Sequence, residues 1–403
     1  YMTSGDQTRI KKTLTAGFLT EDFSYDSEGR VSEFKQTVDY RTSYPMTTSY
    51  IYDTLDRIKE TRYPAQYGLA GNPRKVVEQT YDVASRITSL KVDGQDQASG
   101  ITYNAADQAV SVKVGSAGAN QITETYSYDS QTGFTTNQKV KRGSQTLLDL
   151  SYDYSRGNSN GSINGRTGQI GQIVNNLDSN KNRRFEYDAL GRLKTTVGGS
   201  NLWLQNYTYD RYGNRTNVTA SGVAADNSAI PRDGVPNLTY SSDTNRITTS
   251  GYEYDVAGNQ TRSLAEDGVS WIKYEYDAAN RLQIVKKDDG TLLQAFQFGS
   301  SNARLMSHDY VSNQLTIFAN NGGEILSEYK EFTPQQPTWT KSNIYLGQKL
   351  LSTSKRDSAG GETTEFSHSD QLGTRIITNE ASGTSAEQVS LPFGTALNAE
   401  STG

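Results

Sequence analysis

A short motif that begins with Tyr-Asp and ends in Gly-Arg recurs along this chain, and it constrains the fold more than any other feature. In its clearest copy, residues 185–197, aromatic and polar residues alternate before a tight turn, and Leu193 starts a second run of β-forming residues. Asp188 can accept backbone N–H groups across the turn, and Gly191 can adopt a left-handed backbone without a Cβ clash. The copy therefore predicts a β-hairpin closed by a type I turn with a glycine bulge.

Good copies of the motif extend from about residue 25 to residue 282, and weaker ones begin at Tyr103, Tyr128, Tyr152, Tyr240 and Phe298. The tightest copies lie about 22 residues apart, which is the length of two strands and two turns. The residues that define the structural repeat motif are Tyr25, Asp26, Gly29, Arg30, Tyr52, Asp53, Arg57, Tyr81, Asp82, Arg86, Tyr187, Asp188, Gly191, Arg192, Tyr209, Asp210, Gly213, Tyr254, Asp255, Gly258, Tyr276, Asp277, Asn280 and Arg281. This spacing predicts an all-β fold, a spiralling antiparallel sheet of repeated β-hairpins.

The fifth motif position is Gly, Asn or Asp in every good copy except one, and these residues tolerate a left-handed backbone. Ser85 is the exception, so we expect its hairpin to use another turn. If neighbouring hairpins pair edge to edge, Tyr lies near Tyr, and Asp and Arg form ladders of opposite charge across neighbouring strands. Asp at the start of a turn already has amide partners, so a structural role is favoured over metal binding.

Composition agrees with a thin sheet and excludes several classes of protein. Only 33% of residues are hydrophobic, and 26 Tyr against 11 Phe place most aromatic burial on a side chain whose hydroxyl can remain wet. The net charge of −5, spread over 40 basic and 45 acidic residues, argues against a nucleic-acid partner. No apolar run is long enough for a membrane-spanning helix, and the absence of Cys leaves the compartment open.

The period is interrupted twice and then stops. Residues 157–168 form a Gly/Asn-rich insertion and residues 220–236 a second one; both are predicted to be surface loops because the repeat resumes after each. After about Arg304 the Tyr-Asp motif ends, although strand-like segments continue and no helix is indicated. We therefore expect a hairpin array over residues 1–304, followed at 305–403 by a segment that continues the sheet or caps its end.

These repeats resemble the YD-repeat, or rearrangement-hotspot (RHS) repeat, family of bacterial polymorphic toxins, Tc-toxin shell components and teneurins. The stretch 368–375, His-Ser-Asp-Gln-Leu-Gly-Thr-Arg, together with Leu-Pro-Phe-Gly at 391–394, resembles the beginning of the RHS-associated core of bacterial members. The resemblance implies a β-barrel or cocoon-like shell, or part of one, in a large secreted or cell-surface protein of which this chain is a fragment. It also implies that residues 305–403 are a partial RHS-associated core.

The function implied is a non-enzymatic structural shell that encloses or delivers a C-terminal toxin or effector lying outside this chain. Other shell or secretion-apparatus components are the further partners that the resemblance implies. Family members that cleave themselves do so with an Asp-Pro-containing aspartyl motif, and no Asp-Pro dipeptide occurs in these residues. Self-cleavage is therefore not assigned to this chain.

Residues with catalytic chemistry are few, and none is assigned a catalytic, cofactor-binding or metal-binding role. His368 and Asp370 lie two residues apart on a predicted strand without a specified nucleophile, and His308 is no better placed. The carboxylate pair Asp288 and Asp289 fits a hairpin turn.

An adhesion module that binds carbohydrate or protein is the rival hypothesis. Trp203, Trp271 and Trp339 could stack against sugar rings, and a surface rich in Tyr, Asn and Gln could bond sugar hydroxyls. Packing on one face of the sheet is the structural alternative for each tryptophan.

Overall fold

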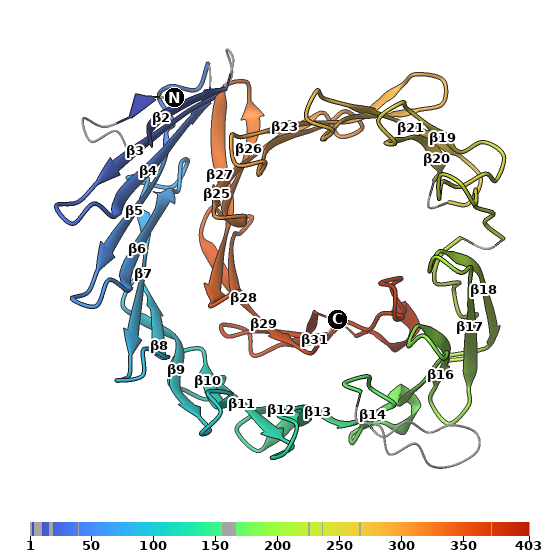
Figure 1. Ribbon diagram of the computed structural model, residues 1–403. Helices are drawn as coiled ribbons and strands as arrows, with labels where there is room; N and C mark the ends of the chain where they lie inside the picture. Colours follow the sequence, from blue (N-terminus) through green and yellow to red (C-terminus); the bar gives the residue numbers. More distant parts are fainter. Residues whose placement is uncertain are drawn as a thin grey trace. The chain divides into compact units, whose positions relative to one another are not determined.

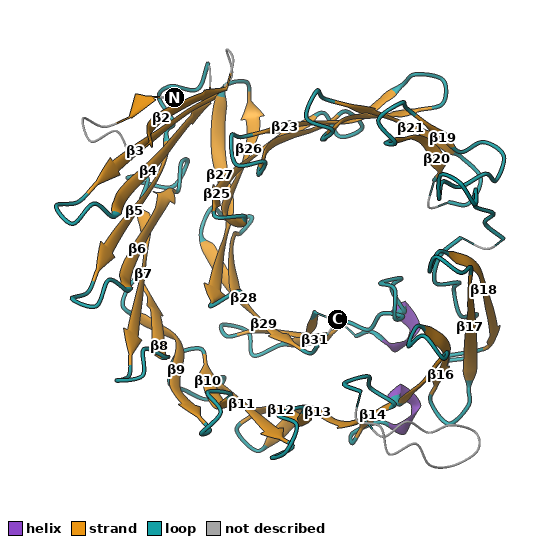
Figure 2. Cartoon of the chain, in the orientation of Figure 1, coloured by secondary structure: helices purple, strands orange, loops and turns teal. Residues whose placement is uncertain are grey.

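The computed structural model describes residues 2–3, 10–15, 19–38, 40–154, 167–224, 226–235, 237–265, 267–371 and 373–402. Within these ranges the chain is built from β-strands and two single-turn 3-10 helices, Ser179–Lys181 and Asn398–Glu400 (Figure 2). Most of the first predicted insertion, residues 157–166, lies outside the described residues. The all-β, hairpin-repeat prediction is confirmed.

The strands fall into two antiparallel sheets, and each strand pairs with its neighbours along the chain. The first sheet contains β1 (Met2–Thr3), β2 (Ile10–Thr15), β3 (Leu19–Tyr25), β4 (Val31–Val38), β5 (Met46–Tyr52), β6 (Ile58–Ala65), β7 (Arg74–Tyr81), β8 (Ile87–Val92), β9 (Gln95–Tyr103), β10 (Ala109–Val114), β11 (Ile122–Tyr128), β12 (Thr135–Arg142), β13 (Gln145–Asp153), β14 (Gln172–Asn175), β15 (Arg183–Tyr187), β16 (Leu193–Gly198), β17 (Trp203–Tyr209) and β18 (Arg215–Gly222). The second contains β19 (Glu253–Tyr254), β20 (Gln260–Leu264), β21 (Trp271–Tyr276), β22 (Leu282–Lys287), β23 (Leu292–Phe298), β24 (Arg304–Asp309), β25 (Gln314–Asn321), β26 (Glu324–Thr333), β27 (Gln336–Leu346), β28 (Lys349–Arg356), β29 (Glu362–Ser369), β30 (Thr374–Asn379) and β31 (Ser385–Glu387).

The chain divides into two compact units, each made of two separate segments. Unit 1 comprises Tyr1–Ser99 and Glu253–Glu365, and unit 2 comprises Gly100–Tyr252 and Phe366–Gly403. The two units are defined by which residues lie close together in space. The boundary expected at residue 304 marks a different property, the point in the sequence where the Tyr-Asp motif ends. The assignment of residues 305–403 to an RHS-associated core therefore stays a prediction.

Unit 1 contains two face-to-face layers, β3–β6 from the first sheet and β24–β28 from the second (Figure 1). Apolar side chains from both layers form its core, and the largest of them, Trp339 and Tyr329, are at most 1% exposed. The Tyr329 hydroxyl donates to the Ala65 carbonyl at 2.9 Å, and the Trp339 backbone N–H donates to Tyr67 at 2.8 Å. Polar groups of the second layer are thus paired with backbone of the first, as burial requires.

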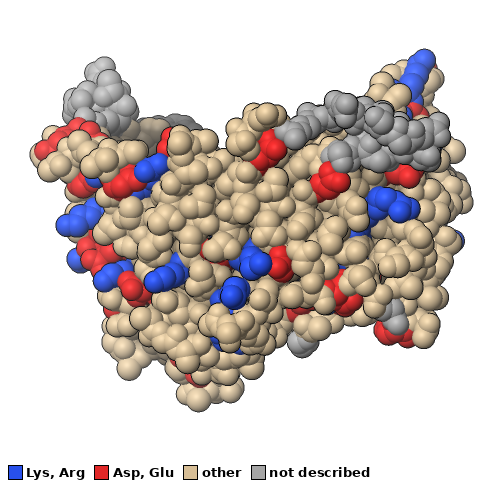
Figure 3. All heavy atoms as spheres, turned by 90° about the horizontal axis from the view of Figure 1, so that it is seen from below, with Lys and Arg blue, Asp and Glu red and all other residues tan. Residues whose placement is uncertain are grey.

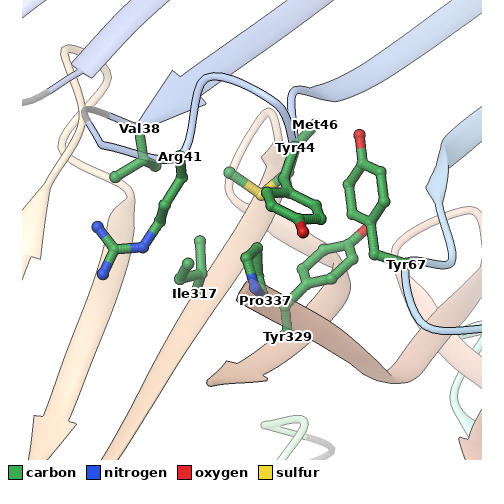
Figure 4. Close-up of a pocket in the computed structure, with 8 residues that line it drawn as sticks. All are labelled: Val38, Arg41, Tyr44, Met46, Tyr67, Ile317, Tyr329 and Pro337. Atoms are coloured by element: carbon green, nitrogen blue, oxygen red, sulfur yellow. The ribbon is translucent and has the colours of Figure 1, made fainter. Parts of the chain in front are cut away.

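The space between these layers closes around a few large side chains (Figure 4). Tyr44 and Tyr67 meet edge to face with ring centres 5.1 Å apart, and Tyr67 lies 5.9 Å from Tyr329. Arg41 reaches across to Glu331, whose side chain is 7% exposed, so the two layers are also joined by an ion pair at the rim. The side chains fill this space, which makes it a core and not a ligand site.

Unit 2 packs the segment Phe366–Gly403 against the strands β10–β18. Its core contains Trp203, 1% exposed, together with Leu391 and Leu397 from that segment and Ala224 and Ile230 from the second insertion. The prediction that residues 220–236 form a surface loop is therefore wrong for Ala224 and Ile230, which are buried. Few large apolar residues mark this insertion, and besides the nearby Trp203 its buried partners Leu391 and Leu397 lie more than 150 residues further along the chain.

Charges on the molecular surface are mixed. Lys and Arg side chains alternate with Asp and Glu on the face shown in Figure 3, without a patch of one sign. Among the described residues, no helix has the length and apolarity to span a membrane.

Candidate functional site

The repeated turn has one geometry, which the copy at Asp188 illustrates. The Asp188 backbone N–H donates to the Arg192 carbonyl at 2.9 Å, and the Gly191 N–H donates back to the Asp188 carbonyl at 3.0 Å. Strand pairing shifts register just before this turn, between Glu186 and Tyr187, which is the predicted bulge. The backbone at Gly191 has a φ of +81°, a value that suits glycine because it has no Cβ.

The aspartate side chain closes the turn from inside. Asp188 Oδ1 accepts the backbone N–H groups of Leu190 and Arg192 at 3.0 and 2.9 Å, and Oδ2 accepts Arg192 Nε at 2.6 Å. Among the described residues, five turns contain this Asp–Arg pair at a spacing of four residues. In two others an Asn side chain replaces Arg, and Asn214 and Asn259 donate to Asp210 and Asp255 at 2.7 and 2.9 Å.

Ser85 adopts the same turn as the other copies, which corrects the expectation of a different one. Its φ is +64°, and its N–H donates to Asp82 at 3.0 Å, as at the glycine-containing turns. Asp56 and Asn280 are also left-handed, with φ of +60° and +59°. The hydrogen bonds around the aspartate thus impose the backbone conformation even where the residue does not favour it.

Where the motif ends in arginine, this side chain can connect the turn to the next repeat. The Arg57 guanidinium lies 4.5 Å from the centre of the Tyr81 ring, and the Tyr81 hydroxyl donates to the carbonyl of Ile58, the residue after Arg57, at 2.7 Å. Arg57 Nη1 also donates to Ser85 Oγ in the following turn at 3.1 Å. We call this combination of stacked guanidinium and hydroxyl-to-carbonyl bond the Arg–Tyr lock.

The lock recurs in both units. The stacking distance is 4.5 Å for Arg30 over Tyr52 and 4.8 Å for Arg192 over Tyr209, and both hydroxyls donate to the carbonyl that follows the arginine, at 2.9 and 2.7 Å. At the weak copy Phe298, the Arg281 guanidinium still stacks at 4.9 Å, although the ring carries no hydroxyl. Each contact is weak alone, but the set ties consecutive hairpins together at their turn ends.

The lock differs from the predicted ladders. Asp and Arg pair mostly within single turns, at 2.6 to 2.7 Å, and Arg30 also contacts Asp56 of the next repeat at 2.5 Å. A guanidinium, and not a second tyrosine, covers the tyrosine ring at the positions above. The pairing of strands alone does not predict that a guanidinium stacks on the tyrosine ring. The stacking depends on how far each turn is displaced from the next.

The turn aspartates are held in their charged form. At Asp53, the side-chain hydrogen bond from Arg57 has the largest effect and lowers the pKa of the carboxyl group. At Asp82, the backbone N–H of Arg86 has the largest effect and also lowers the pKa. Burial opposes both shifts without reversing them.

His368 belongs to a buried polar cluster that the sequence did not indicate. Its Nδ1 lies 2.5 Å from Glu124 Oε1 and its Nε2 lies 2.9 Å from Thr378 Oγ1, so both ring nitrogens are engaged without Asp370. A hydroxyl, an imidazole and a carboxylate in this order also occur in hydrolase triads. However, His368 is 0% exposed, Thr378 2% and Glu124 5%, so a substrate has no access to the hydroxyl, and the cluster has a structural role.

The other candidate acids and bases lie in strand β24, for His308, and in a hairpin turn, for Asp288. The His308 ring stacks on Tyr310 at 4.1 Å. Asp288 pairs with Arg262 at 2.8 Å and Lys273 at 3.2 Å, and the hydrogen bond from Arg262 leads the lowering of its pKa to about 2. Among the described residues, no group of three or more His, Cys, Asp or Glu side chains could hold a metal ion.

Two further buried anchors, also missed from the sequence, hold the segment Phe366–Gly403 in unit 2. Arg183 pairs with Glu400, whose side chain is 2% exposed, and Trp203 Nε1 donates to the same carboxylate at 3.2 Å. Burial lowers the pKa of the Arg183 guanidinium, although Glu400 opposes this shift. Asp233, 0% exposed, accepts the Phe393 backbone N–H at 2.7 Å. The two partners of such an anchor are far apart in sequence, by 217 residues for Arg183 and Glu400, so no local sequence pattern marks them.

Comparison with known proteins links the repeated turn to a family. Residues 161–320 match the family model described as the teneurin YD-shell. This part of the chain is therefore similar in sequence to the YD shell of that family. No curated protein matches the chain.

Solved structures of Tc toxins have a fold similar to this one over nearly the whole chain. The Photorhabdus luminescens Tc holotoxin pore, with a mutation in TccC3, has a TM-score of 0.69 at 17% identity and covers 94% of this chain. The crystal structure of TcdB2-TccC3-TEV has a TM-score of 0.67 at 17% identity and covers 94% of this chain. The crystal structure of TcdB2-TccC3 without its hypervariable C-terminal region has a TM-score of 0.62 at 17% identity and covers 96% of this chain. In each case the chain spans 20% of the length of the matched chain.

Two of the three tryptophans of the adhesion hypothesis are buried and are not available as a sugar platform. Trp203 and Trp339 are 1% and 0% exposed. Trp271 is partly exposed, and the Arg262 guanidinium lies 4.4 Å from its ring centre. Packing, the structural alternative for each tryptophan, accounts for the first two.

Proposed function

We propose that this chain is a wall segment of a shell that encloses or delivers a C-terminal effector. The observation that carries the proposal is the Arg–Tyr lock, which repeats between successive hairpins as at Arg57 and Tyr81. A container needs a wall that is continuous and stiff, yet thin. The lock supports this because it joins hairpins at their turn ends, in addition to the backbone ladders between strands.

The wall role agrees with the composition. A chain with only 33% hydrophobic residues cannot rely on a thick core throughout, and partly wet tyrosines that bond backbone carbonyls replace part of it. We propose no enzymatic step for this wall, because the triad-like cluster at His368 is buried and the carboxylate pair at Asp288 stabilises a turn.

The enclosed partner is proposed from the similar structures, whose names pair TcdB2 with TccC3 and mention a hypervariable C-terminal region. By analogy, the partner of this wall is a C-terminal effector that lies outside this chain, with further shell or secretion components. A shell that delivers an effector operates outside the cell that makes it, so we place the protein as secreted or at the cell surface.

Two experiments test this function. The first reads the natural coding sequence downstream of Gly403: an aspartyl core motif followed by an unrelated variable domain supports the shell, whereas a cell-wall anchor or repeated binding modules contradicts it. The second exposes the natural protein to protease and follows any domain after the core. We expect that domain to be protected in the intact protein and cut after the lock is broken by Arg57→Ala together with Arg192→Ala.

The matched control is Arg211→Ala, since Arg211 stacks at 4.5 Å on Tyr212 within its own turn and does not reach a ring in another repeat. Protection should survive this change. Equal protease sensitivity of the downstream domain in the unmodified protein and in the lock variants would contradict enclosure.

A further inference from the structure

An open cavity of about 320 Å³ lies in unit 1, between the two layers at the end where the motif turns are found. One side is formed by residues of β3 to β6, and the other by the turn that follows β23 and by the end of β25 with the turn after it. Its volume is within the range of small-ligand sites, near the lower end. The filled space of Figure 4 is separate from it and is lined by different residues.

The floor of this cavity is aromatic. Phe23 and Phe34 face each other with ring centres 4.9 Å apart and planes inclined by 32°, and both are partly exposed. Tyr52, Val31 and Ile58 extend the floor, also with partial exposure. Such a surface offers a flat apolar face to a ring of similar size.

The rim opposite the floor carries neutral polar groups. The Tyr50 hydroxyl donates to Asn321 Oδ1 at 3.0 Å, which leaves the Asn321 amide group oriented as a donor at the rim. Ser301 adds an exposed hydroxyl beside it. A ligand that uses both sides must therefore be apolar on one face and carry hydroxyl or carbonyl groups at its edge.

The charges around the cavity exclude ionic ligands. Its one lining carboxylate, Glu21, is 2% exposed and already accepts bonds from Thr13 at 2.8 Å, Gln36 at 3.2 Å and Ser300. Among the described residues that line the cavity there is no Lys or Arg. The nearest cation that the structure shows is Arg30, which stacks on Tyr52 and is already paired with Asp26 and Asp56, so a phosphate, sulfate or carboxylate would find no unpaired counter-charge. A cation would find a carboxylate that is already bonded.

We propose that this cavity binds a neutral saccharide, with one sugar ring placed over Phe23 and Phe34 and its hydroxyl groups bonded to Asn321 and Ser301. A pyranose ring has an apolar C–H face and polar edges, which matches the aromatic floor and the amide and hydroxyl rim. An aromatic side chain from a peptide would use the floor but leave the rim groups without a partner, so it fits less well. This inference goes beyond the proposed shell and does not depend on it.

The test is ligand-observed NMR and calorimetry on the intact chain with maltose, cellobiose and N-acetylglucosamine as probes. Indole and phosphate serve as the aromatic and anionic competitors. We expect saccharide binding of about 1 mM affinity, as is reasonable for one ring in an open site, and signals from the ring C–H groups that face the aromatic floor. Phosphate should not compete.

Two variants locate the site. Phe34→Ala removes half of the aromatic floor, and Asn321→Asp removes the amide donor while it keeps an acceptor for Tyr50; each should weaken binding about tenfold. Phe298→Ala is the matched control, because it removes a partly exposed ring from a neighbouring cavity of about 410 Å³. Thermal unfolding of each variant shows whether the fold is retained. If Phe34→Ala does not fold, the effect of Asn321→Asp on saccharide binding decides whether the cavity is the binding site.

The inference is overturned if none of the three saccharides binds, or if binding is unchanged by both variants. Displacement of the bound sugar by indole at equal or lower concentration would also overturn it, because the site would then select an aromatic ring and not a saccharide.

Discussion

The Arg57 guanidinium covers the Tyr81 ring at 4.5 Å, while the Tyr81 hydroxyl bonds the carbonyl of the residue that follows Arg57. Two successive repeats are thus joined by one side chain from each, at the same end of the sheet. Asp53, which bonds Arg57 Nε at 2.7 Å, holds the guanidinium in position. The recurring Tyr, Asp and Arg of each repeat therefore act together, within a turn and between turns.

Removing the tyrosine hydroxyl should weaken this connection. We expect Tyr81→Phe to lower the free energy of unfolding by about 1 kcal/mol, because the Ile58 carbonyl loses a partner while the ring stays stacked. Urea unfolding followed by circular dichroism measures the change. The reciprocal variant is Phe298→Tyr, since Phe298 already lies under Arg281 without a hydroxyl. It should leave stability unchanged or raise it; a loss equal to that of Tyr81→Phe would show that the hydroxyl is not the stabilising group.

Backbone strain at the fifth motif position should be measurable at Ser85. Its φ of +64° is costly for a residue with a Cβ, so Ser85→Gly is expected to be more stable than Ser85→Ala by about 1 kcal/mol. The comparison with alanine cancels the loss of the hydroxyl that accepts a bond from Arg57. Gly213→Ala tests the same strain in the opposite direction and should lower stability. The φ of Gly213 is +93°, and no atom lies within 4 Å of the added Cβ, so a loss of stability would come from the backbone and not from a clash. Equal unfolding midpoints for the two Ser85 variants would contradict the strain argument.

The buried ion pair should be important for docking of the C-terminal segment. Glu400→Gln leaves the Arg183 guanidinium without its counter-charge, and we expect a loss of about 3–5 kcal/mol. Hydrogen exchange across residues 385–402 reports whether the segment detaches. Glu365→Gln is the control, because its pair with Lys355 is 30% and 46% exposed on the two side chains and is expected to contribute less than about 1 kcal/mol. Similar effects of both substitutions would contradict a special role for the buried pair.

Stability should fall in acid because of the turn aspartates. The pKa values of Asp53 and Asp82 are lowered from 3.8 in the folded protein, by the Arg57 side chain and the Arg86 backbone N–H respectively, so the folded state binds protons less readily than the unfolded chain. Their stabilisation is present above pH 3.8 and is lost as the pH falls through the lowered values. Urea midpoints measured from pH 7 to pH 2 should therefore drop steeply below 3.8.

Replacing both aspartates tests this origin of the pH dependence. The double variant Asp53→Asn and Asp82→Asn should be less stable at pH 7 but lose less on acidification than the unmodified chain. Asp243→Asn, in the weak turn that begins at Tyr240, serves as the control and should follow the unmodified curve. If the double variant loses as much stability on acidification as the unmodified chain, groups other than Asp53 and Asp82 cause the pH dependence.

Much of the fold follows from the local code of the repeat. Asp188 and Gly191 specify a turn because the hydrogen bonds and the left-handed backbone involve only the next four residues, and alternating aromatic residues specify the strands on either side. The prediction failed for Ser85, since residue preference was given more weight than the bonds that Asp82 makes. It also failed for residues 220–236, because Leu391 and Leu397, which share the core with Ile230, lie more than 150 residues away.

The sequence by itself thus determined the hairpins, their direction of pairing and the repeat, since each depends on contacts within about one repeat length. The tertiary structure alone decided that arginine stacks on the next tyrosine, that Glu124 and Thr378 surround His368, and that Arg183 receives Glu400. These contacts join residues whose separation ranges from 10 residues, for His368 and Thr378, to 244 residues, for His368 and Glu124. Their geometry arises only when the sheets have formed and packed, and no local pattern of side chains can encode it.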